Sequence, residues 1–222
     1  MVRQARGPGL RGKKGLIEAL YTAPPEGIVL CVDELGPESA KSYRGTRLLR
    51  PPADEAAPSP RATQEIDYGR RGGGYVFAAF RPATGEALTA PYDRRTAANF
   101  VDFLTAIDRW LGPTEAPVYL ILDNLSTHHA PDVLLFAARH PRWAFVYQPV
   151  YAAWLNLIEP WWKILRSLAL KGRRFESWGE ICDAVDRATA YWNAHKHPFV
   201  WGHRRRHRPR RQPGLALSPN VR

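Results

Sequence analysis

The chain has 222 residues, of which 45% are hydrophobic and 11% aromatic, which is enough for a sizeable core in one large domain or two small ones. This composition excludes a disordered tail protein, and no apolar run approaches the roughly 20 residues that would span a bilayer. The formal net charge of +11 favours a polyanionic partner, most often nucleic acid, although six of the positive charges lie between residues 204 and 211.

The first 90 residues predict three strands, with a long irregular stretch between the first strand and the other two. Residues 1–26 predict a partly ordered basic arm with a short helical stretch at 16–21, and no apolar segment behind it indicates a secretory signal. The run 27–34 predicts a strand, and Asp33 closes its apolar part. Residues 35–72 are rich in proline, arginine and glycine and predict a long loop or insertion. Segments 74–80 and 86–90 flank the turn sequence PATGE and predict a β-hairpin.

The rest of the chain predicts alternating helices and strands. Helical periodicity is present at 96–111, 155–171 and 178–195, and a short helix is expected at 131–140. The continuous apolar run 118–122 is typical of a buried strand, and 144–150 predicts another. Residues 202–222 form an arginine-rich tail that we expect to be disordered when alone. This order of elements predicts an α/β fold, in which a mixed five-stranded sheet carries helices on both faces.

Three carboxylates stand on strong core elements. Asp33 and Asp123 follow apolar strands, and Glu159 begins a helix whose first turn suits Pro160. If they converge, they could hold two Mg²⁺ or Mn²⁺ ions, because these ions prefer oxygen ligands. Two such ions can activate an attacking water or hydroxyl and stabilise the leaving oxygen in phosphoryl transfer. Taken singly, each acid could instead cap a turn or favour a helix start.

The predicted helix that carries Glu159 has further candidates. Lys163 and Arg166 fall on the same face of this helix as Glu159. The three residues could form an ion-pairing stripe on the surface, or Lys163 and Arg166 could approach a DNA phosphate beside the metals. Core packing is favoured for at least one of Trp161 and Trp162.

Three motifs carry a resemblance to a known family: they are VDELGP around Asp33, LILDNLSTHHAP around Asp123 and WLNLIEPWW around Glu159. Together they resemble the DDE transposases of the bacterial insertion-sequence branch related to Tc1/mariner, over about residues 27–201. The resemblance implies an RNase H-like catalytic domain at 27–201. In it the three acids would be catalytic and would bind two Mg²⁺ or Mn²⁺ ions.

The resemblance also implies accessory residues. Asn124, His128 and Asn156 match positions near the site in that family, with a purely structural role left open for each.

The resemblance further implies a function in DNA transposition, recombination and integration. Water would cleave at the transposon end, and the freed 3′-hydroxyl would then attack target DNA. The implied partners are the terminal inverted repeats, target DNA and a second copy of the chain in a synaptic complex, within the bacterial cytoplasm at the nucleoid. Family members generally carry N-terminal helix-turn-helix domains, which have no room before residue 27 and could be encoded separately. The alternative is a truncated, non-catalytic DNA-binding remnant.

Overall fold

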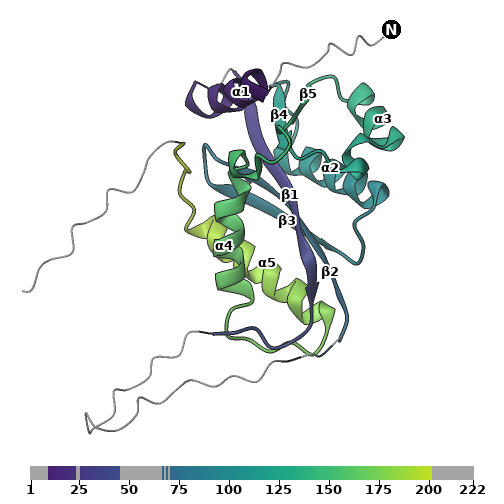
Figure 1. Cartoon of the computed structure of the whole chain (residues 1–222), viewed down its shortest axis with the longest axis vertical. Coiled ribbons are helices and arrows are strands. Elements are labelled where there is room, and N and C mark those ends of the chain that lie inside the picture. Colours follow the sequence, from purple (N-terminus) through teal and green to yellow (C-terminus); the bar gives the residue numbers. More distant parts are fainter. Residues whose placement is uncertain (1–9, 24–25, 46–66, 68, 70, 202–222) are drawn as a thin grey trace, which may run out of the picture.

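Figure 1 shows the protein as a computed structural model, which describes residues 10–23, 26–45, 67, 69 and 71–201. The predicted arginine-rich tail at 202–222 and most of the predicted loop at 35–72 therefore lie outside the described residues.

The centre of the fold is a five-stranded mixed sheet, as the sequence predicted. The strand order is β3-β2-β1-β4-β5. The pairs β1–β2 and β2–β3 are antiparallel, whereas β1–β4 and β4–β5 are parallel. The strands are β1 (Ile28–Ser39), β2 (Gly73–Arg81), β3 (Glu86–Tyr92), β4 (Val118–Leu122) and β5 (Trp143–Tyr147).

Helices cover both faces of this sheet, which is also as predicted (Figure 1). One face packs against α2 and α3, and the other against α1, α4 and α5. The helices are α1 (Leu10–Thr22), α2 (Ala97–Leu111), α3 (Pro131–Arg139), α4 (Ile158–Ala169) and α5 (Trp178–Ala194), with 3₁₀ turns at Ser126–His129 and Ala153–Leu155. No described helix is both long and apolar enough to cross a membrane.

The apolar run of β1 is continuous because this strand is buried on both faces. Successive side chains of a strand point to opposite faces of the sheet. Cys31 and Leu35 accordingly pack in the core beside α4 and α5. Leu30 and Val32 pack in the core beside α2. The same alternation fixes the face on which the polar residues of this strand lie.

The prediction of a loop from residue 35 was wrong for its first five residues, because β1 extends to Ser39. Leu35 pairs with Val76 and Glu38 with Gly74 on β2, with an irregularity between them. The sequence Gly36-Pro37 predicts a turn when it is considered alone. Here the irregular pairing accommodates it, and the strand continues along its partner. Asp33 therefore lies within a long strand and not at its end.

The short helical stretch predicted in the N-terminal arm is part of a longer helix, α1, which packs as an ordered part of the domain. The buried side chains of Ile17 and Leu20 belong to the core beside α4 and α5. The hydroxyl of Tyr21 donates a hydrogen bond to the Leu155 carbonyl at 2.8 Å. Helix α1 is thereby attached to the segment that leads into α4.

Candidate active site

Asp33 lies in β1, and Asp123 directly follows β4, the neighbouring parallel strand. Cys31 of β1 pairs with Ile121 of β4, and each aspartate follows its paired residue by two positions. Both paired residues pack in the core beside α4. Because side chains two positions apart in a strand share a face, Asp33 is directed towards the face that α4 covers, and Trp162 of α4 contacts it there. This is the face from which Glu159 approaches.

Two donors fix the carboxylate of Asp33. Its Oδ1 accepts from the Glu34 amide at 2.8 Å, and its Oδ2 accepts from Trp162 Nε1 at 3.2 Å. Burial raises the pKa of Asp33 to about 7; these hydrogen bonds oppose the rise, and the nearby carboxylates of Glu34 and Glu159 add to it. A bound cation would offset both the lost hydration and the neighbouring negative charge.

Asn156 attaches the start of α4 to β1 and so places Glu159 near Asp33. Its Nδ2 donates to the Val32 carbonyl at 3.0 Å, and its Oδ1 accepts from the Ile158 amide at 3.4 Å. Its own carbonyl accepts from the Glu159 amide at 3.1 Å. Glu159 stands in the first turn of α4, as the sequence predicted. The candidate accessory residue Asn156 is therefore a buried connection between two elements of the site.

Asp123 is held from one side and open on the other. Its Oδ1 accepts from the Leu125 amide at 3.0 Å and lies 3.0 Å from Nδ1 of His128. Burial alone would raise the pKa of Asp123, but hydrogen bonds from His128 and the Leu125 amide hold it below its usual range. The side chain remains 42% exposed. Asn124, the next residue, donates to the Gln148 carbonyl at 2.6 Å and fastens this loop to the end of β5.

His128 is buried between two carboxylates. Its Nε2 lies 2.9 Å from Oε1 of Glu34, and its Nδ1 faces Asp123. Burial alone would lower the pKa of His128, but hydrogen bonds to Asp123 and Glu34 raise it to about 9. The imidazole ring packs on the ring of Phe100, with the two centroids 4.2 Å apart. The backbone carbonyl of His128 accepts a hydrogen bond from the Tyr147 hydroxyl at 3.0 Å.

The chemistry of these donors fits a divalent cation, although the ligands are not drawn tightly together. Within the described ranges, no three His, Cys, Asp or Glu side chains are grouped closely enough to hold a metal ion. Asp33, Asp123 and Glu159 nevertheless supply only oxygen donors, which Mg²⁺ and Mn²⁺ prefer. The poorly solvated Asp33 and the exposed side of Asp123 both suit a cation between the two strands.

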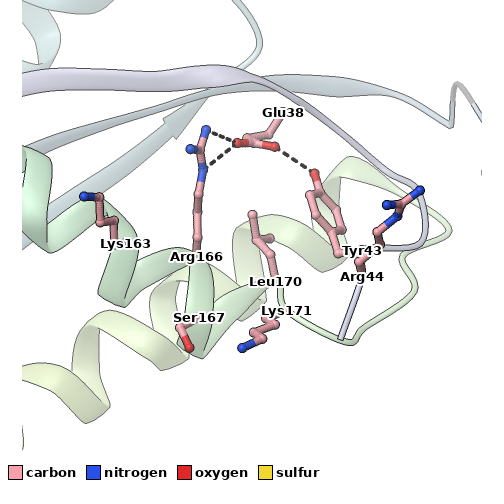
Figure 2. A pocket seen from close by; sticks show the side chains of 8 residues that line it. All are labelled: Glu38, Tyr43, Arg44, Lys163, Arg166, Ser167, Leu170 and Lys171. Atoms are coloured by element: carbon pink, nitrogen blue, oxygen red, sulfur yellow. Dashed lines mark hydrogen bonds and ion pairs between the residues drawn. The ribbon is translucent and has the colours of Figure 1, made fainter. Parts of the chain in front are cut away.

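Lys163 and Arg166 line an open groove beyond Glu159, shown in Figure 2. The groove has a volume of about 590 Å³ and also includes Arg44 and Lys171. Arg166 donates from Nε and Nη2 to Oε1 of Glu38, at 3.2 and 2.9 Å. Among the described residues no ion pair joins Glu159 to Lys163, so the stripe along α4 is not internally paired. Figure 2 shows Glu38 between the side chains of Arg166 and Tyr43.

Two residues of the site were missed or only partly understood from sequence. Glu34 was not a candidate, although it directly follows Asp33 in a strand and alternation alone places it on the opposite face. Core packing was expected for at least one of Trp161 and Trp162, and both side chains are buried. The indole N–H of Trp162 also contacts Asp33, which helical periodicity cannot predict.

Residues 28–182 match the family described as DDE superfamily endonuclease, and this span is more than half of the chain. The chain belongs to the DDE superfamily endonucleases. An insertion element IS630 uncharacterized 39 kDa protein from Shigella sonnei is 22% identical over 111 residues, which are 50% of this chain and 32% of that protein. This DDE endonuclease chain thus spans about a third of the length of that relative.

Solved structures of the Mos1 transposase have the same fold. The paired-end complex with the left transposon end has a TM-score of 0.58 at 15% identity, covering 89% of this chain and 59% of that one. The Mos1 strand transfer complex has a TM-score of 0.56 at 16% identity, covering 89% and 58%. The Mos1 catalytic domain with raltegravir and Mg has a TM-score of 0.52 at 13% identity, covering 85% of each chain. The predicted RNase H-like fold is confirmed.

Proposed function

We propose that this DDE endonuclease chain is the catalytic domain of a transposase that cleaves DNA at the ends of an insertion element and joins the freed 3′ end to target DNA. The observation that carries the proposal is that Asp33 in β1 and Asp123 directly after β4 stand on adjacent strand paths, with Glu159 near Asp33. Membership of the DDE superfamily endonucleases supports it. So does the similarity to an insertion-element protein and to a transposase bound to transposon ends.

In this proposal Asp33, Asp123 and Glu159 hold two divalent ions, Mg²⁺ or Mn²⁺. When bound, such ions activate the attacking oxygen and stabilise the leaving oxygen of a phosphodiester. The chain's own residues orient the ligands. Trp162 fixes one oxygen of Asp33, and Asn156 fixes the helix start that carries Glu159. The similar Mos1 paired-end complex with Mn and the Mos1 catalytic domain with raltegravir and Mg support these metals.

The groove along α4 is proposed to bind the DNA backbone next to the cleavage site. Lys163 follows Glu159 by one helical turn, and Arg166 by about 10 Å along the axis at 1.5 Å per residue. Lys171 and Arg44 continue the positive surface beyond Arg166. Among the described residues that line the groove, Glu38 is the one acid, and it is engaged by Arg166 and by the Tyr43 hydroxyl. A strand of DNA that leaves the carboxylates along α4 would meet phosphate-binding groups in sequence.

The assembly proposed for this domain is a dimeric synaptic complex on the element's inverted repeats. A helix-turn-helix module, encoded separately or elsewhere, would recognise those repeats. Both features follow the family resemblance, and the proposed location is the bacterial nucleoid.

Divalent-metal-dependent nicking of supercoiled plasmid tests the catalytic proposal. We expect Asp33→Asn, Asp123→Asn and Glu159→Gln each to reduce nicking to background. The matched control is Asp132→Asn, which removes an exposed carboxylate in the first turn of α3 and should leave nicking intact. Unchanged nicking in Asp123→Asn would refute the proposal. Loss of Mn²⁺ binding in the same variant, measured by calorimetry, separates a failed metal site from failed DNA recognition.

The groove is tested by the salt dependence of binding to a short DNA duplex. Each phosphate contact removed should reduce the slope of log K against log salt by about 1, so the double variant Lys163→Ala/Lys171→Ala should reduce it by about 2. Arg109→Ala/Arg139→Ala is the control. It removes two exposed arginines from a second groove of about 590 Å³ that precedes β4, at the end away from Asp123. Equal changes in both double variants would refute a specific path along α4.

A further inference from the structure

The imidazole of His128 connects Asp123 to Glu34, a residue on the opposite face of the sheet from Asp33. Glu34 follows Asp33 in β1, and strand alternation directs its side chain towards the face that α2 covers. There it lies 2.9 Å from Nε2 of His128. The other ring nitrogen lies 3.0 Å from Oδ1 of Asp123. The two carboxylates are thus joined through one ring.

This connection is fully enclosed. The side chain of His128 is 0% exposed and that of Glu34 is 1% exposed. A carboxylate removed from water to this extent requires a hydrogen-bonded partner. His128 is the described residue that supplies it, and Oε2 of Glu34 has no hydrogen bond within the described part of the chain. Glu34 therefore determines the orientation of the ring, with Phe100 packed on the ring and restricting its rotation.

The ring in turn determines the orientation of the Asp123 carboxylate. His128 Nδ1 and the Leu125 amide both face the same oxygen, Oδ1. No described residue donates to Oδ2, and the side chain is 42% exposed. One oxygen of Asp123 is occupied by the protein, and the other is directed outward, where a cation can bind it.

We propose that Glu34 is a positioning residue that acts through His128 to hold Asp123 with Oδ2 available to a divalent cation. This inference rests on the proposed function, because it assigns a role toward the metal that Asp123 would bind. It adds a buried carboxylate that neither contacts the substrate nor ligates the metal. Partners of this kind orient a ligand, and their loss commonly weakens metal affinity 10- to 100-fold.

Calorimetric titration of the full 222-residue chain with Mn²⁺ in the absence of DNA tests the proposal. Glu34→Gln keeps the size of the side chain and an oxygen that can accept from His128, but removes the charge. We expect Mn²⁺ to bind this variant about 10- to 100-fold more weakly than the wild type. Glu86→Gln is the matched control, because it makes the same change to an ion-paired glutamate on β3 that contacts neither His128 nor Asp123. Wild-type affinity in Glu34→Gln would overturn the proposal.

A double-mutant cycle tests whether the effect passes through His128. If it does, Glu34→Gln should cause no further loss of Mn²⁺ affinity in a His128→Gln background. Losses that simply add would overturn the proposed route. If the proposed function itself is wrong, the result is different: the wild type and Asp123→Asn would bind Mn²⁺ equally. That outcome would refute both the proposed metal site and the role of Glu34.

Discussion

Replacing Asp33 with asparagine should stabilise the metal-free protein, and by more at pH 8 than at pH 5. Burial raises the pKa of Asp33 to about 7 in the folded protein, whereas an aspartate in the unfolded chain titrates near about 3.9. Between these values the folded state holds a proton that the unfolded state has released. The stability of the wild type therefore falls as pH rises from about 4 to about 7 and levels off above it.

The size of the effect follows from this pKa difference. A shift of roughly three units at about 1.4 kcal/mol each gives a total penalty of about 4 kcal/mol, of which about 2–3 kcal/mol develops between pH 5 and pH 8. Asparagine removes the penalty but cannot accept with its Nδ2. It thus loses one of the hydrogen bonds from Glu34 and Trp162, at about 1 kcal/mol at any pH. The expected net gain is about 3 kcal/mol at pH 8 and about 1 kcal/mol or less at pH 5.

Urea unfolding at the two pH values, in the presence of a chelator, measures this difference. Asp132→Asn is the control, since it makes the same change at an exposed carboxylate. Adding Mg²⁺ at pH 8 should stabilise the wild type more than Asp33→Asn, because the cation offsets the charge that the variant lacks. A difference between wild type and Asp33→Asn that is the same at pH 5 and pH 8 would refute the reasoning.

Two further predictions concern the residues that hold the carboxylates. Asn156→Ala should lower the free energy of unfolding by about 1–3 kcal/mol, because it leaves the buried Val32 carbonyl without its donor, and calorimetry should show weaker Mn²⁺ binding. Unchanged unfolding and binding would contradict this role. Trp162→Phe keeps an aromatic side chain but removes the donor that opposes the rise in the pKa of Asp33. That pKa, followed by NMR titration, should increase further, and a decrease would show that the indole N–H does not stabilise the carboxylate.

The sequence predicted the positions of the acids because their signals are local. Asp123 follows five apolar residues that form a short buried strand, and Glu159 precedes a proline suited to the first turn of a helix. The apolar run before Asp33 likewise predicted a strand. These patterns located the three elements that carry the acids, and the family resemblance supplied the expectation that the acids form one site.

The extent of β1 could not be predicted in the same way, because it depends on a distant partner. Leu35 and Glu38 are extended because β2 offers backbone groups for them to pair with. Between them lies Gly36-Pro37, whose local preference is for a turn. The pairing partners are about 40 residues away along the chain, a separation over which local periodicity carries no information.

The contacts that orient the side chains were out of reach for the same reason. Asn156 and Val32 are 124 residues apart, and His128 and Glu34 are 94 apart. The sequence placed Asn156 and His128 near the site by resemblance but left their roles open. Glu34 was not a candidate, because an acidic residue within a strand normally faces solvent. Here both faces of the strand are covered, so the side chain of Glu34 is buried.

Strand β1 holds α4 at two points, and this connects the carboxylates to the groove. Near one end of the helix Asn156 donates to the Val32 carbonyl, and towards the other Arg166 donates to Glu38. Sliding α4 by one turn, about 5.4 Å, would break both contacts and would also move Glu159 away from Asp33. The distance between the proposed metal ligands and the proposed phosphate-binding groups is therefore set by two rigid elements and not by a loop. A DNA strand held in the groove would present its phosphates to the carboxylates at a fixed spacing, which is what in-line attack at one phosphodiester requires.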